Sequence, residues 1–201
     1  MGRLDAVDDV PDPVGPPRTP LLHPSELDPA QAALHAEITD GPRAAQTLIP
    51  LTDPEDRLLG PFALMLLVPQ VGSAVQALGA ALRTSTELDA QSRELAVLVV
   101  AAHERSRFEW LAHQPAALAC GLTRTQLQQV LDDAVPSGLD TTKRCVVRTT
   151  RALLSDGTLD DEQYLDALRE LGRARLAELV WLVGYYRMLA TAIAALRPEE
   201  G

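Results

Sequence analysis

A glutamate and a histidine stand four residues apart in the middle of the chain, at Glu109 and His113. If this segment is helical, the spacing puts both side chains on one face, within reach of a common ligand. A carboxylate that binds an imidazole selects one ring tautomer and raises the basicity of the ring, which suits proton transfer near neutral pH. Such pairs are also common on helix surfaces, and Glu109 could instead complete a capping box with Ser106. The pair is therefore a candidate acid–base site with a purely structural alternative.

Three further polar side chains precede this pair. Glu94 begins a run of apolar residues, where it lies either beside the site or at a helix N-terminus whose dipole favours a negative charge. His103 ends the same run, and the dipole of a helix C-terminus would by itself stabilise a protonated ring there. The guanidinium of Arg83 could bind a substrate carboxylate through two parallel hydrogen bonds, although an ion pair with an acidic residue is equally consistent.

The charge of the chain excludes some classes of partner. The formal net charge is −10 and the sequence pI about 4.8, so the overall field repels nucleic acid and anionic membrane surfaces. An anionic small molecule would need a local basic cluster, or these side chains simply solvate helix ends; the best-grouped candidates are Arg83, Arg93, Arg105 and Arg107.

The cysteines and histidines indicate neither a metal centre nor a bound cofactor. Cys120 and Cys145 are too far apart in sequence to form a metal knuckle or a redox motif. His103 and His113 lack a convincing third ligand. We therefore expect chemistry that needs no metal and no cofactor.

The remaining composition is typical of a cytoplasmic protein. The first twenty residues carry acids and prolines in place of the basic and apolar regions of a signal peptide. Apolar runs such as Leu95 to Ala102 are much shorter than the ~20 residues that span a bilayer. We expect a protein in a reducing compartment that contacts no membrane.

Helix signals recur from residue 21 onward, and no segment alternates strictly between apolar and polar residues as a strand would. Five prolines among acidic residues predict a mobile arm from Met1 to about Pro20, unless it docks on a neighbouring subunit. The remainder, residues 21–201, is expected to form a single all-α domain. The expected helices cover residues 28–39, a short stretch within 58–67, 69–83, 88–103, 106–120, 123–133, 140–154, 160–171 and 175–196.

The central motifs resemble those of a known family. Arg93-Glu94 opens one expected helix, and Phe108-Glu109-Trp110-Leu-Ala-His113 opens the next, followed by Gly121-Leu122. This pattern resembles the signature of the carboxymuconolactone decarboxylase and AhpD-like superfamily. Further matches extend the resemblance from Leu21 to about Pro198: Gly60-Pro61-Phe62, Leu78-Gly79, Arg83 and Gly184-Tyr185-Tyr186. The resemblance implies an AhpD-like helical bundle.

The chain departs from the peroxidase branch of that superfamily at its redox residues. In that branch a Cys-x-x-Cys pair precedes the histidine, and a glutamate on the preceding helix helps to activate the thiols. The matching positions here are Ser106 and Glu109 for the cysteines, His113 for the histidine and Glu94 for the glutamate. Neither Ser106 nor Glu109 can supply a thiolate, so the resemblance favours the decarboxylase branch.

The resemblance implies a cofactor-independent lyase that acts on a small carboxylated lactone or oxo-acid. His113 would be the acid/base and Glu109 its orienting partner, with Glu94 and His103 as secondary groups and Arg83 on the substrate carboxylate. Substrate-lining positions are expected at Trp110, Phe62, Tyr185 and Tyr186, for each of which core packing is the alternative. Two enzymatic alternatives are a proton-transfer isomerase or cyclase and, less favoured, a redox protein.

A non-catalytic helical oligomer is a further alternative, against which the intact Glu109/His113 spacing counts. A homo-oligomer, trimeric or hexameric, is expected from the resemblance. The apolar stretch from Leu64 to Val68 is a further hint, because it is more hydrophobic than most monomer surfaces.

Overall fold

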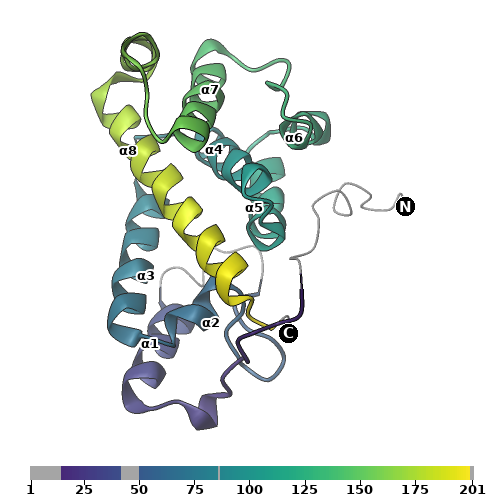
Figure 1. Ribbon diagram of the computed structural model, residues 1–201, viewed down its shortest axis with the longest axis vertical. Helices are drawn as coiled ribbons and strands as arrows, with labels where there is room; N and C mark the ends of the chain where they lie inside the picture. The colour runs from purple at the N-terminus through teal and green to yellow at the C-terminus, as the bar shows by residue number, and fades with distance from the viewer. Residues whose placement is uncertain (1–14, 42–49, 86, 200–201) are drawn as a thin grey trace. The chain divides into compact units, whose positions relative to one another are not determined.

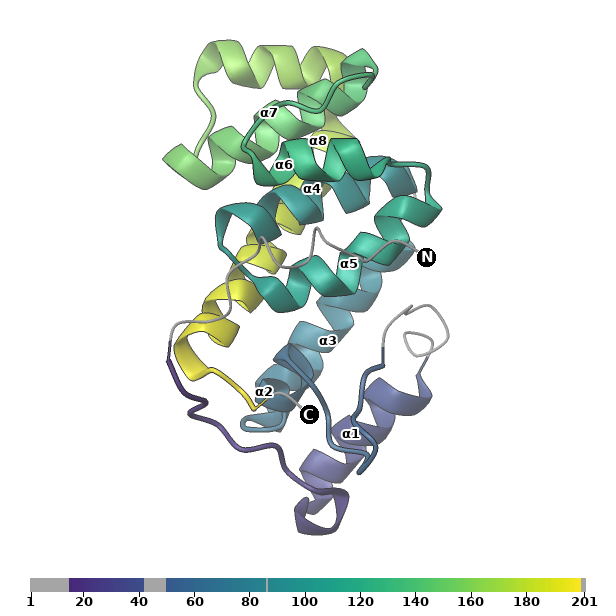
Figure 2. The same ribbon diagram turned by 90° about the vertical axis from the view of Figure 1, so that its right-hand side faces the viewer.

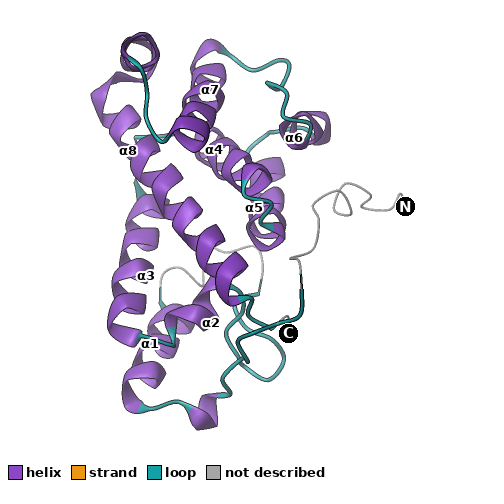
Figure 3. Cartoon of the chain, viewed as in Figure 1, coloured by secondary structure: helices purple, strands orange, loops and turns teal. Residues whose placement is uncertain are grey.

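The computed structural model describes residues 15–41, 50–85 and 87–199, and these residues form helices joined by loops, with no strand among them (Figures 1 and 3). The all-α fold that the sequence predicts is therefore confirmed. The elements are η1 (Pro24–Glu26), α1 (Pro29–Asp40), α2 (Pro61–Met65), α3 (Pro69–Thr84), α4 (Ala90–His103), α5 (Arg107–Ala119), α6 (Arg124–Leu131), α7 (Thr141–Asp156) and α8 (Asp161–Leu196).

The chain divides into two compact units, where the sequence predicts one domain from residue 21. The first unit comprises Ser85–Ala190 and therefore holds α4 to α7 and most of α8. The second unit holds α1 to α3 together with the last residues of α8 and the segment that follows it. Each unit is described by itself below.

Helix α4 is the centre of the first unit. It packs against α5, α6 and α7, and Figure 2 shows these helices gathered around it. Because neighbours cover it on several sides, all seven residues from Leu95 to Ala101 are buried. The continuous apolar run that predicted a buried helix thus reflects burial on every face.

Helix α8 contains a break at Gly172, where the sequence predicts that one helix ends before another begins. Gly172 has φ 77° and ψ 169°, a backbone conformation that favours glycine. Beyond it, the helix continues to Leu196 and is long and apolar enough to cross a membrane by length and composition alone. Core helices of other proteins meet the same criterion, and 39% of its most apolar 18-residue window is buried.

In the second unit, α1 and α2 both pack against α3. Gly72 lets the chain approach itself closely, because a Cβ there would lie 2.3 Å from the carbonyl oxygen of Met65. The apolar stretch from Leu64 to Val68, which the sequence offers as a hint of a subunit contact, is only partly exposed. Its first three residues are buried, and only Leu67 and Val68, in the turn between α2 and α3, are exposed.

The N-terminal segment of the described chain is bound to its C-terminal segment. The backbone N–H of Arg18 donates to the carbonyl of Arg197 at 2.9 Å, and Thr19 Oγ1 donates to the carbonyl of Leu196 at 2.8 Å. Leu21, which directly follows the predicted arm, is buried within the same chain. The rest of the predicted arm, residues 1–14, lies outside the described residues.

The predicted capping box at the start of α5 is wrong. Ser106 is the N-cap residue, but its side chain makes no capping hydrogen bond. Among the described residues, Ser106 Oγ is buried and has no hydrogen-bond partner. The physical reason lies with Glu109, whose carboxylate faces the ring of His113 in place of the N-cap backbone.

Alanine substitutions at two N-cap residues should distinguish a side chain that makes a capping hydrogen bond from one that makes none. Asp89→Ala removes a carboxylate that accepts from the Ser92 backbone N–H at 2.9 Å, and should lower the free energy of unfolding by about 1 kcal/mol. Ser106→Ala removes a hydroxyl that lacks a partner among the described residues, and should leave that free energy unchanged or slightly higher. Urea denaturation measures both, and a large loss in Ser106→Ala would contradict the assignment.

Candidate active site

A short, buried polar contact inside the first unit joins the two central helices of the predicted site. His113 Nδ1, from α5, lies 2.7 Å from Glu94 Oε2, from α4, and both side chains are buried. A carboxylate can only accept, so the ring donates through Nδ1–H and the neutral ring carries its free electron pair on Nε2. Glu94 therefore selects the tautomer of His113.

The second carboxylate faces the other nitrogen of the same ring. Glu109 Oε2 lies 3.7 Å from His113 Nε2, and the side chain is only 3% exposed. The two residues are one helical turn apart, as their spacing predicts, yet this distance exceeds a hydrogen bond. The carboxylate hydrogen-bonded to the ring is therefore that of Glu94, and Glu109 lies beside the other ring nitrogen.

An aromatic pair from α8 encloses the ring. Tyr186 meets His113 edge to face, with the ring centroids 5.0 Å apart, and Tyr185 meets Tyr186 in the same way at 5.2 Å. Such packing restricts rotation of the imidazole and excludes bulk water from one side of it. The site of the first unit is therefore built by α4, α5 and α8.

Cys120 lies at the C-terminal end of α5 and is partly buried. Burial raises the pKa of its thiol, and the negative charge of Glu94 raises that pKa further. The thiol is consequently protonated at neutral pH, which is the opposite of what a reactive cysteine needs. The same carboxylate that orients His113 thus suppresses thiolate formation nearby.

Two other predicted site residues in the first unit lie apart from this cluster. His103 is exposed in the last turn of α4, nine residues from Glu94. At about 100° per residue that spacing puts the two side chains on opposite sides of the helix. Trp110 is completely buried in the core, so it packs there in place of lining an open surface.

Two predicted substrate-binding residues belong to the second unit. Arg83 is half-buried in the last turn of α3, and Phe62 is buried in α2. Tyr185, the remaining prediction, is buried on α8 in the first unit beside Tyr186.

Two further buried polar groups lie on α8: Tyr186, which the sequence offers as a cavity-lining residue, and Glu178, which the sequence prediction passed over. Tyr186 shares the buried face of the helix with Leu182 and Leu189, so helical periodicity could have placed it inside. Glu178 is buried and accepts hydrogen bonds from Ser85 Oγ at 2.7 Å and from the Leu88 backbone N–H at 3.2 Å. No local sequence signal reveals this contact, because its partners are about ninety residues away.

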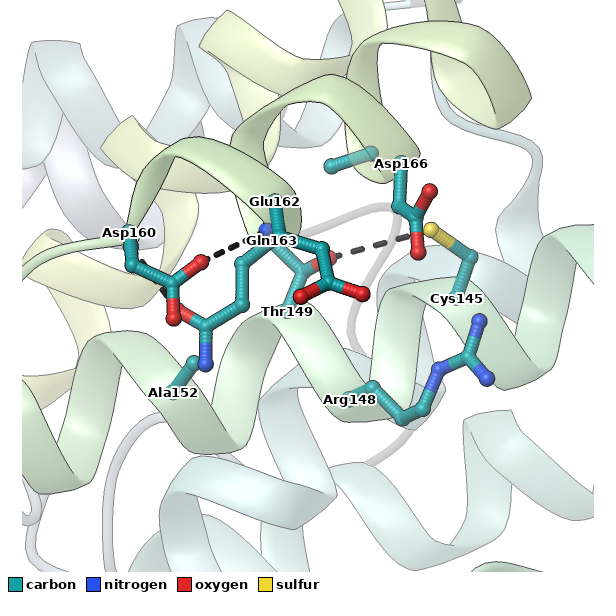
Figure 4. A pocket seen from close by; sticks show the side chains of 9 residues that line it. Cys145, Arg148, Thr149, Ala152, Asp160, Glu162, Gln163 and Asp166 are labelled. Carbon is teal, nitrogen blue, oxygen red and sulfur yellow. Dashed lines mark hydrogen bonds between the residues drawn. The ribbon is translucent and has the colours of Figure 1, made fainter.

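A separate pocket of about 350 Å³ lies between α7 and the beginning of α8, and no member of the His113 cluster lines it (Figure 4). Its polar groups are largely engaged in local structure. Asp160 Oδ1 accepts from the Gln163 backbone N–H at 2.8 Å as an N-cap, and Cys145 Sγ lies 3.8 Å from Thr149 Oγ1. Among the described residues, no group of three or more side chains has the arrangement of a metal site.

Comparison with known proteins agrees with this geometry. The model of the carboxymuconolactone decarboxylase family matches residues 69–152, which include Glu94, Glu109 and His113. This part of the chain is similar to the carboxymuconolactone decarboxylase family. The family resemblance read from the central motifs is thereby confirmed.

Solved structures of the AhpD-like fold superpose on nearly the whole chain. One is an AhpD-core, peroxidase-related protein from Ralstonia eutropha JMP134, with a TM-score of 0.68, 13% identity and coverage of 91% of this chain and 92% of that one. Another is a variant of the debrominase Bmp8 bound to 2,3,4-tribromopyrrole, with a TM-score of 0.67, 13% identity and coverage of 94% and 93%. No curated protein matches the sequence significantly. At this identity the two structures establish the fold.

The thiol of Cys120 offers a direct report on the charge of Glu94. In a Cys145→Ser background, Glu94→Gln removes the negative charge that raises the pKa of Cys120, so alkylation by iodoacetamide at pH 8 should become faster. Glu109→Gln is the matched control and should leave the rate nearly unchanged. An unchanged rate in Glu94→Gln would contradict the proximity of an ionised Glu94 to this thiol.

Proposed function

We propose that this protein is a cofactor-independent lyase that decarboxylates a small carboxylated lactone or oxo-acid by general acid/base catalysis. The observation that carries the proposal is the buried imidazole of His113, held through Nδ1 at 2.7 Å from Glu94 while Nε2 faces Glu109 at 3.7 Å. A ring fixed in this way has one nitrogen committed to orientation and one available for proton transfer. The family of residues 69–152 includes decarboxylases by name, which supports the choice of reaction.

The proposed reaction has two steps. The bond between the substrate carbon and its carboxylate breaks, carbon dioxide leaves, and the electron pair passes into an adjacent carbonyl to form an enolate. For the second step the ring is protonated on both nitrogens: it gives its Nε2 proton to the carbon, which leaves the neutral ring with its free electron pair on Nε2. Nε2 then takes up a proton from water, directly or through Glu109, before the next turnover. Glu94 keeps the ring in place throughout, because its hydrogen bond is made to the nitrogen that does not react.

An anionic substrate near two carboxylates requires a compensating positive charge. A planar guanidinium suits a carboxylate, and the family resemblance gives this role to Arg83. We further propose a cytoplasmic protein that binds neither nucleic acid nor membrane and that assembles as a homo-oligomer.

A proton-transfer isomerase or cyclase would use the same three side chains. The two reactions differ in their products, because only the lyase releases carbon dioxide. A panel of carboxylated lactones and oxo-acids, assayed for carbon dioxide and for deuterium incorporation from solvent, distinguishes them. Release of carbon dioxide with one deuteron incorporated supports the lyase, whereas deuterium incorporation without carbon dioxide release supports the isomerase.

His113→Gln should lower the turnover rate by the ~10²–10⁴-fold typical of a lost general acid/base. Glutamine can retain a hydrogen bond to Glu94, so the thermal midpoint should change little. Glu109→Gln and Glu94→Gln should also lower the turnover rate. The ratio of the two variants' turnover rates reports which carboxylate takes part in proton transfer. Near-wild-type turnover in a folded His113→Gln variant would remove the centre of the proposal.

Thiol chemistry should be dispensable. Ser106 and Glu109 occupy the positions of the cysteine pair, and the raised pKa of Cys120 keeps that thiol protonated. Replacing Cys120 and Cys145 together by alanine should therefore leave turnover nearly intact. Loss of turnover in a double variant with a normal circular dichroism spectrum would favour the redox alternative.

A further inference from the structure

An exposed stripe of apolar and small residues runs along α8 on the side away from Tyr186. The exposed large residues are Val180, Trp181 and Met188, with 40%, 67% and 42% of their surface accessible. The small residues Ala174, Ala177 and Gly184 are also exposed along this stripe. A single exposed hydrophobic residue is ordinary, but an exposed tryptophan within a continuous apolar stripe marks a contact surface.

The stripe has the spacing of a helix-pairing seam. Ala174, Ala177, Trp181, Gly184 and Met188 are separated by three, four, three and four residues, which is the a/d pattern of a heptad repeat. None of the five is charged. The seam extends about 21 Å along the helix, at a rise of about 1.5 Å per residue. This pattern calls for another helix as the occupant.

The sizes of the seam residues indicate that the partner helix is α8 of a second copy. When two copies of α8 pair in opposite directions about a two-fold axis, the numbers of any two residues that face each other add up to the same total. With Trp181 against Gly184 of a second copy, Met188 meets Ala177 of that copy, so each large side chain faces a small one. Pairing in the same direction would instead set Trp181 against Trp181 and leave Gly184 against Gly184.

The notch at Gly184 is open in the single chain. A Cβ built there has no atom within 4 Å, so the space above the helix backbone is free to receive an indole ring. An isologous contact of this kind requires the same patch to contain both the knob and its notch. Trp181 and Gly184 meet that requirement within one turn of one helix.

We propose that α8 of one copy pairs antiparallel with α8 of a second copy, with Trp181 of each seated over Gly184 of the other. The contact is independent of the proposed reaction. A two-fold contact generates a dimer or, combined with a three-fold contact, a hexamer, and it excludes an assembly built on a three-fold axis alone. One helix pair buries less than the ~800 Å² per partner of a standard interface, so we expect micromolar dissociation through this contact alone.

Cross-linking tests the register directly. In the full chain with Cys120 and Cys145 replaced by alanine, the double variant A177C/M188C should form a covalent dimer on mild oxidation, joined by two disulfides. Within one copy these positions are three helical turns apart and cannot bond to each other. Neither single variant should cross-link. Efficient cross-linking by A177C alone would indicate parallel pairing, and no cross-linking by the double variant would overturn the contact.

Sedimentation equilibrium tests the energetics. Trp181→Glu should raise the dissociation constant of the two-fold contact by about 30-fold or more, as expected for a central interface tryptophan. Gly184→Leu should act similarly because it fills the notch. Leu165→Glu is the matched control, since Leu165 is 55% exposed on α8 but lies outside the seam. Unchanged association in both seam variants would overturn the proposal, as would binding to phosphatidylglycerol vesicles that Trp181→Glu abolishes, because the stripe would then face lipid.

Discussion

The hydrogen bond between Glu94 and His113 is the contact on which the candidate site depends. It joins the central helix of the first unit to α5 across 2.7 Å, in a place where neither side chain meets bulk water. A buried charge is stable only when it is hydrogen-bonded, so each residue requires the other. This single bond fixes the ring tautomer, directs Nε2 toward Glu109 and holds a negative charge that adds to the effect of burial in raising the pKa of the Cys120 thiol.

The negative charge of Glu94 has opposite consequences for a redox site and for an acid–base site. In a thiol enzyme, a base beside the cysteines promotes the thiolate. Here the matching positions are Ser106 and Glu109, and the charge of Glu94 acts against thiolate formation. Under the proposed function the fold carries acid–base groups at these positions, which agrees with the principle that function resides in the site and not in the fold.

Local signals predicted most of the helices because their ends are chemically marked. Asp28, Thr123 and Asp140, at which three of the expected helices begin, are N-caps, and each accepts a hydrogen bond from the first turn of its helix. Gly172 breaks α8 where the sequence predicts a boundary. Long-range contacts were not predictable in this way. Which carboxylate is hydrogen-bonded to His113 depends on how α4 packs against α5, and Ser106 makes no capping hydrogen bond although its spacing to Glu109 fits a capping box.

The tautomer of His113 is the most direct test of this account. Long-range proton–nitrogen correlation spectra of histidine labelled with ¹⁵N distinguish a protonated from an unprotonated ring nitrogen, without any need for a substrate. The account predicts that the neutral ring of His113 carries its proton on Nδ1, and that Glu94→Gln weakens this preference while Glu109→Gln preserves it. A neutral ring protonated on Nε2 in the wild-type protein would contradict the account, because the orienting bond to Glu94 would then be missing.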